Sequence, residues 1–68
     1  MADVYKHYKG GIYFIIGMGK HTESEEDLVI YEGTDGRLWA RPSSMFLDEV
    51  EVNGVKTKRF EHIGHFYR

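Results

Sequence analysis

The sequence predicts an all-β domain, and three observations favour that class. The aromatic side chains, five tyrosines, four phenylalanines and one tryptophan, offer large rigid surfaces that suit strands better than helices. Glycines recur between short runs of β-branched and aromatic residues, which is typical of strands separated by turns. No window of about 11 residues keeps apolar side chains at helical spacing with capping signals at both ends. A helical bundle is therefore not expected.

The first predicted strand is Ile12–Lys20. Apolar side chains occupy both alternating sets of positions in this run, so both faces of the strand should be covered. Gly17 and Gly19 remove side chains from the strand, and we expect a bulge or a sharp bend there. The next segment, His21–Asp27, carries four carboxylates in seven residues and is interpreted as a loop.

Two further strands follow at Leu28–Glu32 and Arg37–Arg41. They are joined by the predicted turn Gly33–Gly36, because Asp and Gly tolerate the positive φ that hairpin turns require. Pro42 cannot donate a backbone hydrogen bond to a strand ladder, so the third strand should end there.

The segment from Pro42 to Phe46 predicts a short 3₁₀ turn that places Met45 and Phe46 on the core. Together with the strands and the glycine bends, this turn predicts a small five-stranded SH3-like barrel, with an OB-like barrel as the second choice. All 68 residues should form one domain. We expect residues 1–6 and 64–68 to be loose termini.

A final hairpin is predicted at Asn53-Gly54, because this dipeptide between alternating residues is the strongest short-range hairpin signal. Opposed positions count outward equally from the turn, so the strands should pair Val52 with Val55, Glu51 with Lys56, Val50 with Thr57 and Glu49 with Lys58. The basic run Lys56–Arg59 is then largely matched by glutamates across the hairpin. A solvated hairpin is favoured there over a phosphate-binding patch.

The overall charge of −2, from nine basic and eleven acidic residues, gives no global attraction to nucleic acid. Nucleic-acid binding would need a local basic patch. No cysteine is present, which fits a reducing compartment, and the first residues have no apolar secretory signal, so we expect a cytoplasmic protein. The longest apolar run, Ile12–Ile16, is far shorter than the roughly 20 residues needed to cross a bilayer, and no membrane partner is expected.

Known catalytic and metal-binding motifs are not matched. The Gly-Lys pair that ends at Lys20 lacks the first glycine and the following hydroxyl residue of a nucleotide-binding loop. Zinc motifs built on cysteine are excluded, and His62 and His65 are interpreted as tail residues. No serine lies in a strand-to-helix elbow. We therefore expect no enzyme, no cofactor and no metal site.

The acidic loop offers one alternative to that conclusion. His21, Glu23 and Glu26 could converge if the loop folds back, which would suit a metal-dependent hydrolase. The loop lacks the glycine and the regularly spaced ligands of a calcium loop. Clustered carboxylates of this kind are more often simply a solvated loop.

The stretch Arg37 to Pro42 holds the single tryptophan between two arginines. Strand alternation places Arg37, Trp39 and Arg41 on one face, which we expect to point outward, away from the apolar interior. A guanidinium beside an exposed ring suits a planar or an anionic ligand. The residue types slightly favour a second interpretation, in which Trp39 packs at the core rim and the stems of Arg37 and Arg41 cover it.

These residues lead to the hypothesis of a non-enzymatic module that binds a small anionic or planar ligand, or a peptide. The candidate ligand-binding residues are Trp39, Arg41, Arg37, Tyr8, Lys9, His21, Glu23 and Glu26. A second hypothesis is single-stranded nucleic-acid binding, in which bases stack on Tyr5, Tyr8, Tyr13 and Trp39. The hydrolase built on the acidic loop is the third.

Five segments together carry a family resemblance: YKHYKGGIY, KHTESEEDLVIY, LWARPSSMF, VEVNG and RFEHIG. With them the chain resembles an uncharacterised family of small bacterial and phage-borne proteins known as domain of unknown function 1653. The resemblance spans nearly the whole chain and implies a compact β domain. It implies no reaction, substrate or partner. The matched polar positions form only a candidate surface, namely Lys9, His21, Glu23, Glu26, Trp39 and Arg41.

Overall fold

The computed structural model describes residues 2–67, and the predicted all-β class is confirmed over that range. Seven strands and one short helix follow one another along these residues. Their bounds are β1 Ala2–His7, β2 Ile12–Lys20, β3 Asp27–Gly33, β4 Leu38–Pro42, α1 Ser43–Phe46, β5 Glu49–Val52, β6 Val55–Lys58 and β7 Phe60–Phe66. Within the same range no helix has the length and apolar character that spanning a membrane requires.

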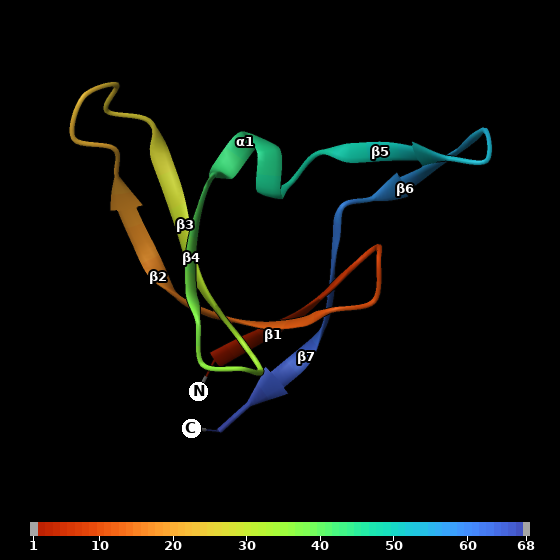
Figure 1. The fold of residues 1–68 in the computed structure, drawn as a ribbon, viewed down its shortest axis with the longest axis horizontal. Coiled ribbons are helices and arrows are strands. Elements are labelled where there is room, and N and C mark those ends of the chain that lie inside the picture. The colour runs from red at the N-terminus through yellow and green to blue at the C-terminus, as the bar shows by residue number, and fades with distance from the viewer. Residues whose placement is uncertain (1, 68) are drawn as a thin grey trace.

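The main sheet has five antiparallel strands in the order β4-β3-β2-β1-β7, and β5 pairs with β6 in a separate hairpin. The sheet curls into a trough, and α1 lies across the top of its opening (Figure 1). Within residues 2–67 the two edge strands β4 and β7 do not pair, so this sheet is open rather than a closed barrel. The main sheet also differs in membership from the prediction, because β1 and β7 take the places expected for the hairpin strands.

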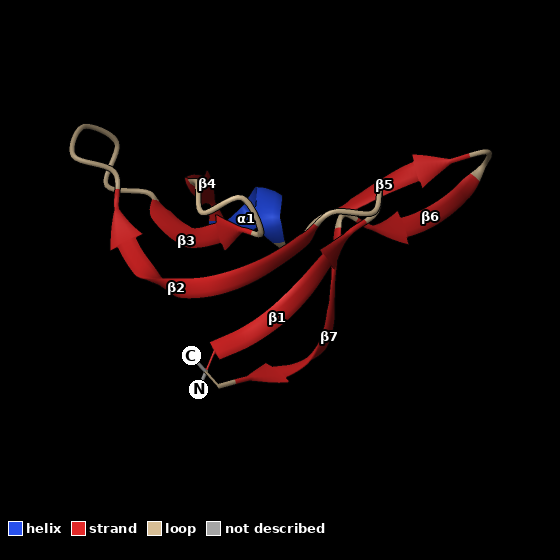
Figure 2. Ribbon diagram, turned by 60° about the horizontal axis from the view of Figure 1, so that its bottom comes forward, coloured by secondary structure: helices blue, strands red, loops and turns tan. Residues whose placement is uncertain are grey.

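Two irregularities bend the sheet. In β2 the register with β3 shifts between Ile15 and Gly17, which confirms the bulge expected from the glycines of this strand. The curvature of β2 along its length is plain in Figure 2. A second shift lies between β1 and β7, where Val4 pairs with Gly64 but Tyr5 pairs with His62. One irregularity in the β2–β3 pair and one in the β1–β7 pair let the sheet wrap around its own aromatic side chains.

The expectation of loose termini is wrong for residues 2–6 and 64–66. Residues 2–6 belong to β1, a central strand, and residues 64–66 belong to β7. Each segment lacks a strong alternating pattern of its own, and each becomes a strand because it pairs with the other across nearly the full length of the chain. Positions 1 and 68 lie outside the described residues.

A single stacked pair of aromatic rings forms the centre of the core. Phe46 is 2% exposed and lies face to face with Phe60, with ring centroids 4.1 Å apart and ring planes 8° apart. The predicted turn is one turn of α-helix, and it buries Phe46 as expected but leaves Met45 45% exposed. The four buried residues of the cluster are Val29, Tyr31, Phe46 and Phe60, with Tyr5, Tyr13 and Ile15 packed against them.

The Asn53-Gly54 hairpin has the predicted register at all four residue pairs. Asn53 has φ 50° and Gly54 has φ 80°, as a two-residue turn of this type requires. The hairpin β5–β6 extends away from the main sheet (Figures 1 and 2). Its apolar side is therefore only partly covered, and Val55 is exposed.

We expect Phe46→Ala to lower the free energy of unfolding by about 3–5 kcal/mol, because it removes a fully buried ring and leaves a cavity. Phe46→Leu should cost only about 1–2 kcal/mol, since most of the apolar volume stays while the ring stack is lost. Met45→Ala, one position earlier and half-exposed, is the matched control and should cost much less. Urea denaturation followed by circular dichroism measures all three. Equal losses at positions 45 and 46 would contradict this account of the core.

Candidate functional site

Trp39 and Arg41 lie on the concave side of the sheet. Trp39 pairs with Tyr31 and Arg41 pairs with Val29. Directly opposed residues of an antiparallel pair share a face, and Tyr31 and Val29 are both buried in the core. The predicted alternation therefore holds, but the expected outward direction is wrong. Because β4 is an edge strand, Trp39 still keeps 45% of its surface exposed, so it packs at the rim of the core.

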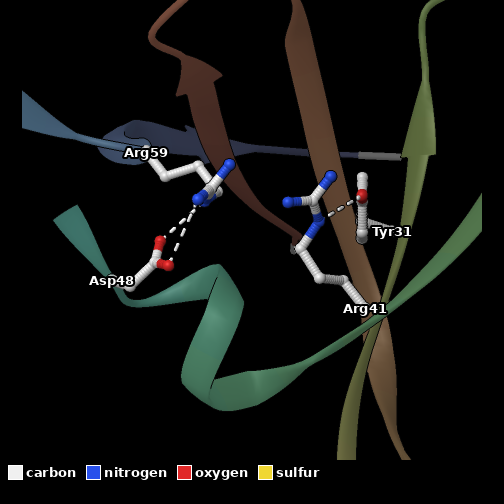
Figure 3. A network of polar contacts seen from close by, with 4 residues as sticks. All are labelled: Tyr31, Arg41, Asp48 and Arg59. Carbon is white, nitrogen blue, oxygen red and sulfur yellow. Dashed lines mark hydrogen bonds and ion pairs between the residues drawn. The ribbon is translucent and has the colours of Figure 1, made fainter. Parts of the chain in front are cut away.

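The guanidinium of Arg41 lies over aromatic rings of the core. Its Nε donates a hydrogen bond of 3.4 Å to the hydroxyl of Tyr31 (Figure 3). Its guanidinium carbon is 5.6 Å from the ring centre of Phe60, a cation–π distance that suits a weakly hydrated guanidinium. Within residues 2–67 no carboxylate lies at ion-pair distance from this guanidinium. Among the described residues, Arg41 therefore holds a positive charge at the core rim with no carboxylate at ion-pair distance.

Arg59, in contrast, has a carboxylate partner. Its Nε lies 2.6 Å from Oδ1 of Asp48, and its Nη2 lies 3.3 Å from Oδ2, so two parallel hydrogen bonds join the groups (Figure 3). These bonds lower the pKa of Asp48, and the nearby charge of Arg41 lowers it slightly further. The carboxylate of Asp48 therefore interacts mainly with Arg59.

His7 lies beside Phe60 and is affected by the positive charges of this region. Its ring lies edge-on to Phe60, with centroids 4.9 Å apart, and its Nδ1 accepts a 3.1 Å hydrogen bond from the backbone of Lys9. The pKa of His7 is lowered, first because the ring is partly desolvated and then because Arg41, Arg59 and Lys9 repel a further proton. We call His7, Arg41, Asp48 and Arg59 the Arg41 cluster. It combines two guanidiniums with one carboxylate.

A hollow of about 180 Å³ opens beside Trp39, at the turn between β3 and β4. The rings of Trp39 and Tyr13 contribute its aromatic surface. Trp39 and Arg41 are alternate residues of one strand, so they are about 6.6 Å apart along β4 on the same face. The complete lining is Gly11, Ile12, Tyr13, Gly33, Thr34, Asp35 and Trp39.

Three other predicted residues differ in their relation to the Arg41 cluster. Arg37 precedes β4, is exposed and lies 3.5 Å from a carboxylate oxygen of Asp35, so it stands apart. Tyr8 and Lys9 follow β1, and the Tyr8 ring packs against His7 with centroids 4.6 Å apart. The ammonium of Lys9 is 5.7 Å from the centre of the Tyr8 ring. Tyr8 and Lys9 therefore border the cluster through His7.

The acidic loop is not brought to Trp39. It lies at the start of β3 whereas Trp39 pairs near the end of that strand, a separation of roughly 13 Å for about four residues at some 3.3 Å each. Its polar groups bond one another instead. Nδ1 of His21 accepts from the backbone N–H of Glu23 at 3.1 Å, and the hydroxyl of Ser24 donates to Glu26 at 3.1 Å. Such local bonds are typical of a solvated loop.

Sequence reasoning missed two groups of residues. The pair of Asp48 and Arg59 could have been predicted. One more step outward in the predicted hairpin register sets these two residues opposite each other. The other group is Asp3, His62 and His65, whose side chains gather between β1 and β7 and could hold a metal ion. Nothing in the local pattern marks it, because it depends on the pairing of the first and last strands.

The curved antiparallel sheet, with the Arg41 cluster on its concave side, defines a small all-β domain. The model of a family described as "Protein of unknown function (DUF1653)" matches residues 3–62, so the chain belongs to that family. The resemblance inferred from the sequence is thereby confirmed. A crystal structure of a DUF1653 protein from Bordetella bronchiseptica is similar over 100% of this chain and 92% of that one, with a TM-score of 0.84 and 26% identity. No curated protein matches the chain.

The lowered pKa of His7 predicts how stability depends on pH. The folded protein takes up this proton less readily than the unfolded chain, so stability is complete above the ordinary pKa of about 6.5 and falls as the pH drops below it. The slope from one proton is at most about 1.4 kcal/mol per pH unit. Urea denaturation between pH 7.5 and pH 5 should give a steeper loss for the native chain than for His7→Gln. Identical pH profiles would contradict the lowered pKa of His7.

Proposed function

We propose that the protein is a non-enzymatic binding module that holds a small anionic ligand on its Trp39–Arg41 face. One observation carries this proposal: within the described residues, the partly buried guanidinium of Arg41 has no carboxylate at ion-pair distance, whereas Arg59 beside it has Asp48. A charge held in place at a core rim is pre-organised to receive an anion. The pKa of His7, which is lowered first by desolvation and then by the charges of Arg41, Arg59 and Lys9, supports the same conclusion through those three charges.

The half-exposed ring of Trp39 adds a preference for a planar group. An anion on Arg41 and a ring on Trp39 would be about 6.6 Å apart, which is the spacing of alternate residues in a strand. Small molecules that join a carboxylate or phosphate to an aromatic ring span this distance. An acidic peptide would use the same guanidinium and is the second ligand class within this proposal.

The two other hypotheses receive less support. Stacking of single-stranded nucleic acid needs open aromatic faces, yet Tyr5 and Tyr13 are packed edge-on against rings of the core. A metal-dependent hydrolase would need the side chains of the acidic loop to be free to bind a metal ion. His21 and Glu26 are engaged in bonds within that loop.

We also propose an SH3-like fold and a cytoplasmic location for the module. Short antiparallel strands, bulges that bend the sheet and one helical turn after β4 support an SH3-like relationship. The lack of cysteine supports a reducing compartment, and we place the module in the cytoplasm.

We expect nucleoside monophosphates and aromatic carboxylates to bind more tightly than inorganic phosphate, and to change the fluorescence of Trp39. Arg41→Gln should weaken the binding of these probes at least about tenfold, because a hydrogen bond to a charged group contributes about 1.5–3 kcal/mol. Arg37→Gln removes the same charge from an exposed position directly before β4 and is the matched control. It should leave the affinity nearly unchanged.

The proton affinity of His7 supplies a second readout of the same experiment. A bound anion offsets the charges of Arg41 and Arg59, so the pKa of His7 should rise when the probe binds, as followed by NMR of its imidazole. The absence of any probe-induced change at Trp39 and His7 would overturn the proposal. Equal weakening by the changes at positions 37 and 41 would also overturn it, because non-specific charge would then explain the binding.

A further inference from the structure

A bulge brings two imidazoles to one face of the last strand. His62 and His65 are three residues apart, and in a regular strand such positions point to opposite faces. The register shift between β1 and β7 absorbs one residue, so His62 pairs with Tyr5 and His65 pairs with Asp3. Tyr5 and Asp3 are alternate residues of β1 and share a face. The two imidazoles and the carboxylate of Asp3 are thereby gathered together.

Gly64 stands at the centre of this bulge. It pairs with Val4 immediately beyond the register shift, and its φ is 152°, a value that residues with a side chain rarely adopt. Bulges often re-aim a side chain near a functional site. Here the re-aimed side chain makes a set of three potential metal ligands, which the sequence spacing alone would not produce.

The distances within this set suit a metal ion. The Nε2 of His62 lies 3.1 Å from Oδ1 of Asp3, and the Nδ1 of His65 lies 3.0 Å from the same oxygen. The donor atoms of all three residues lie within 4.8 Å of one another. Ligands bound to one tetrahedral zinc ion at about 2.0–2.1 Å are about 3.3 Å apart. Small side-chain rotations would therefore place an ion between the three atoms.

We propose that Asp3, His62 and His65 form a binding site for a divalent transition metal ion, with zinc as the expected ion. Two imidazoles and one carboxylate are ligands of intermediate softness, which favour zinc and its neighbours over magnesium and calcium. The side chains of Asp3, His62 and His65 are 48%, 43% and 55% exposed, so an ion would be reached directly from solvent. Three protein ligands leave at least one coordination position for water or an exogenous ligand.

The surroundings hold part of this set in place. The ring of His62 packs edge-on against Tyr5 with centroids 5.1 Å apart, and Tyr5 packs in the same way against Phe46 of the core. Asp3 and Tyr5 also line an apolar groove of about 310 Å³ that reaches Phe46 and Met18. An exogenous ligand on the ion would therefore have an apolar surface beside it.

Without a metal, His62 shares a hydrogen bond with Oδ1 of Asp3, and His65 lies at ion-pair distance from the same oxygen. The experiment must separate this arrangement from a metal site. Zinc chloride is titrated by calorimetry into the full chain carrying no histidine tag. We expect one zinc ion per chain and a higher melting temperature when zinc is present, because the ion joins β1 to β7. Magnesium chloride at the same concentration should give neither effect.

Asp3→Asn, His62→Gln and His65→Gln should each weaken zinc binding at least tenfold and reduce the zinc-dependent rise in melting temperature. His21→Gln is the matched control, because His21 is an exposed histidine of the β2–β3 loop with its own local hydrogen bonds. It should bind zinc as the native chain does. A lack of saturable binding, or equal weakening by His21→Gln, would overturn the proposal.

The native chain alone also gives a decisive readout if a variant does not fold. In NMR spectra of the imidazole carbons, zinc should shift the signals of His62 and His65 at one molar equivalent and leave those of His7 and His21 in place. Equal shifts at all four histidines would indicate weak surface binding only and would overturn the proposal.

Discussion

The stacked rings of Phe46 and Phe60 are the contact on which the rest of the structure depends. Phe46 comes from the helical turn after β4, and Phe60 begins β7, so the stack joins the two edges of the bent sheet across its concave side. The other ring pairs among the described core residues meet edge-on, so this stack is the closest contact between them. The same ring of Phe60 also supports Arg41 and His7, so the core and the cation cluster share one surface.

Local signals in the sequence predicted those parts of the fold that local interactions decide. The register of the Asn53-Gly54 hairpin follows from the turn, and the bend near Gly17 follows from missing side chains, so both could be predicted. Strands β1 and β7 could not, because neither has a strong apolar alternation and each depends on a partner that is distant in the sequence. Open or closed sheet geometry depends on the same distant pairing.

The sequence predicted that Trp39 and Arg41 belong to the candidate site, but not the face of the sheet on which they lie. Alternation correctly placed Trp39 and Arg41 together, yet it could not show that their shared face is the core face, which depends on the burial of Tyr31 and Val29 opposite. The hairpin register predicts the partners of the charges on the hairpin, and one further step of that register sets Asp48 opposite Arg59. That Arg41 has no carboxylate at ion-pair distance within residues 2–67 could not be predicted in this way, because it depends on how the hairpin and α1 pack against β4 and β7.

Strand β1 connects the proposed metal site with the Arg41 cluster. Asp3 and His7 lie on one face of this strand, near its two ends. Its pairing with β7 joins Ala2 to Phe66, a loop of more than sixty residues. During synthesis on the ribosome, a central strand of the sheet must therefore wait for its second neighbour until nearly all of these residues have emerged. Long-range pairing of this kind slows folding, and until β7 arrives one side of β1 presents unpaired backbone groups to other chains.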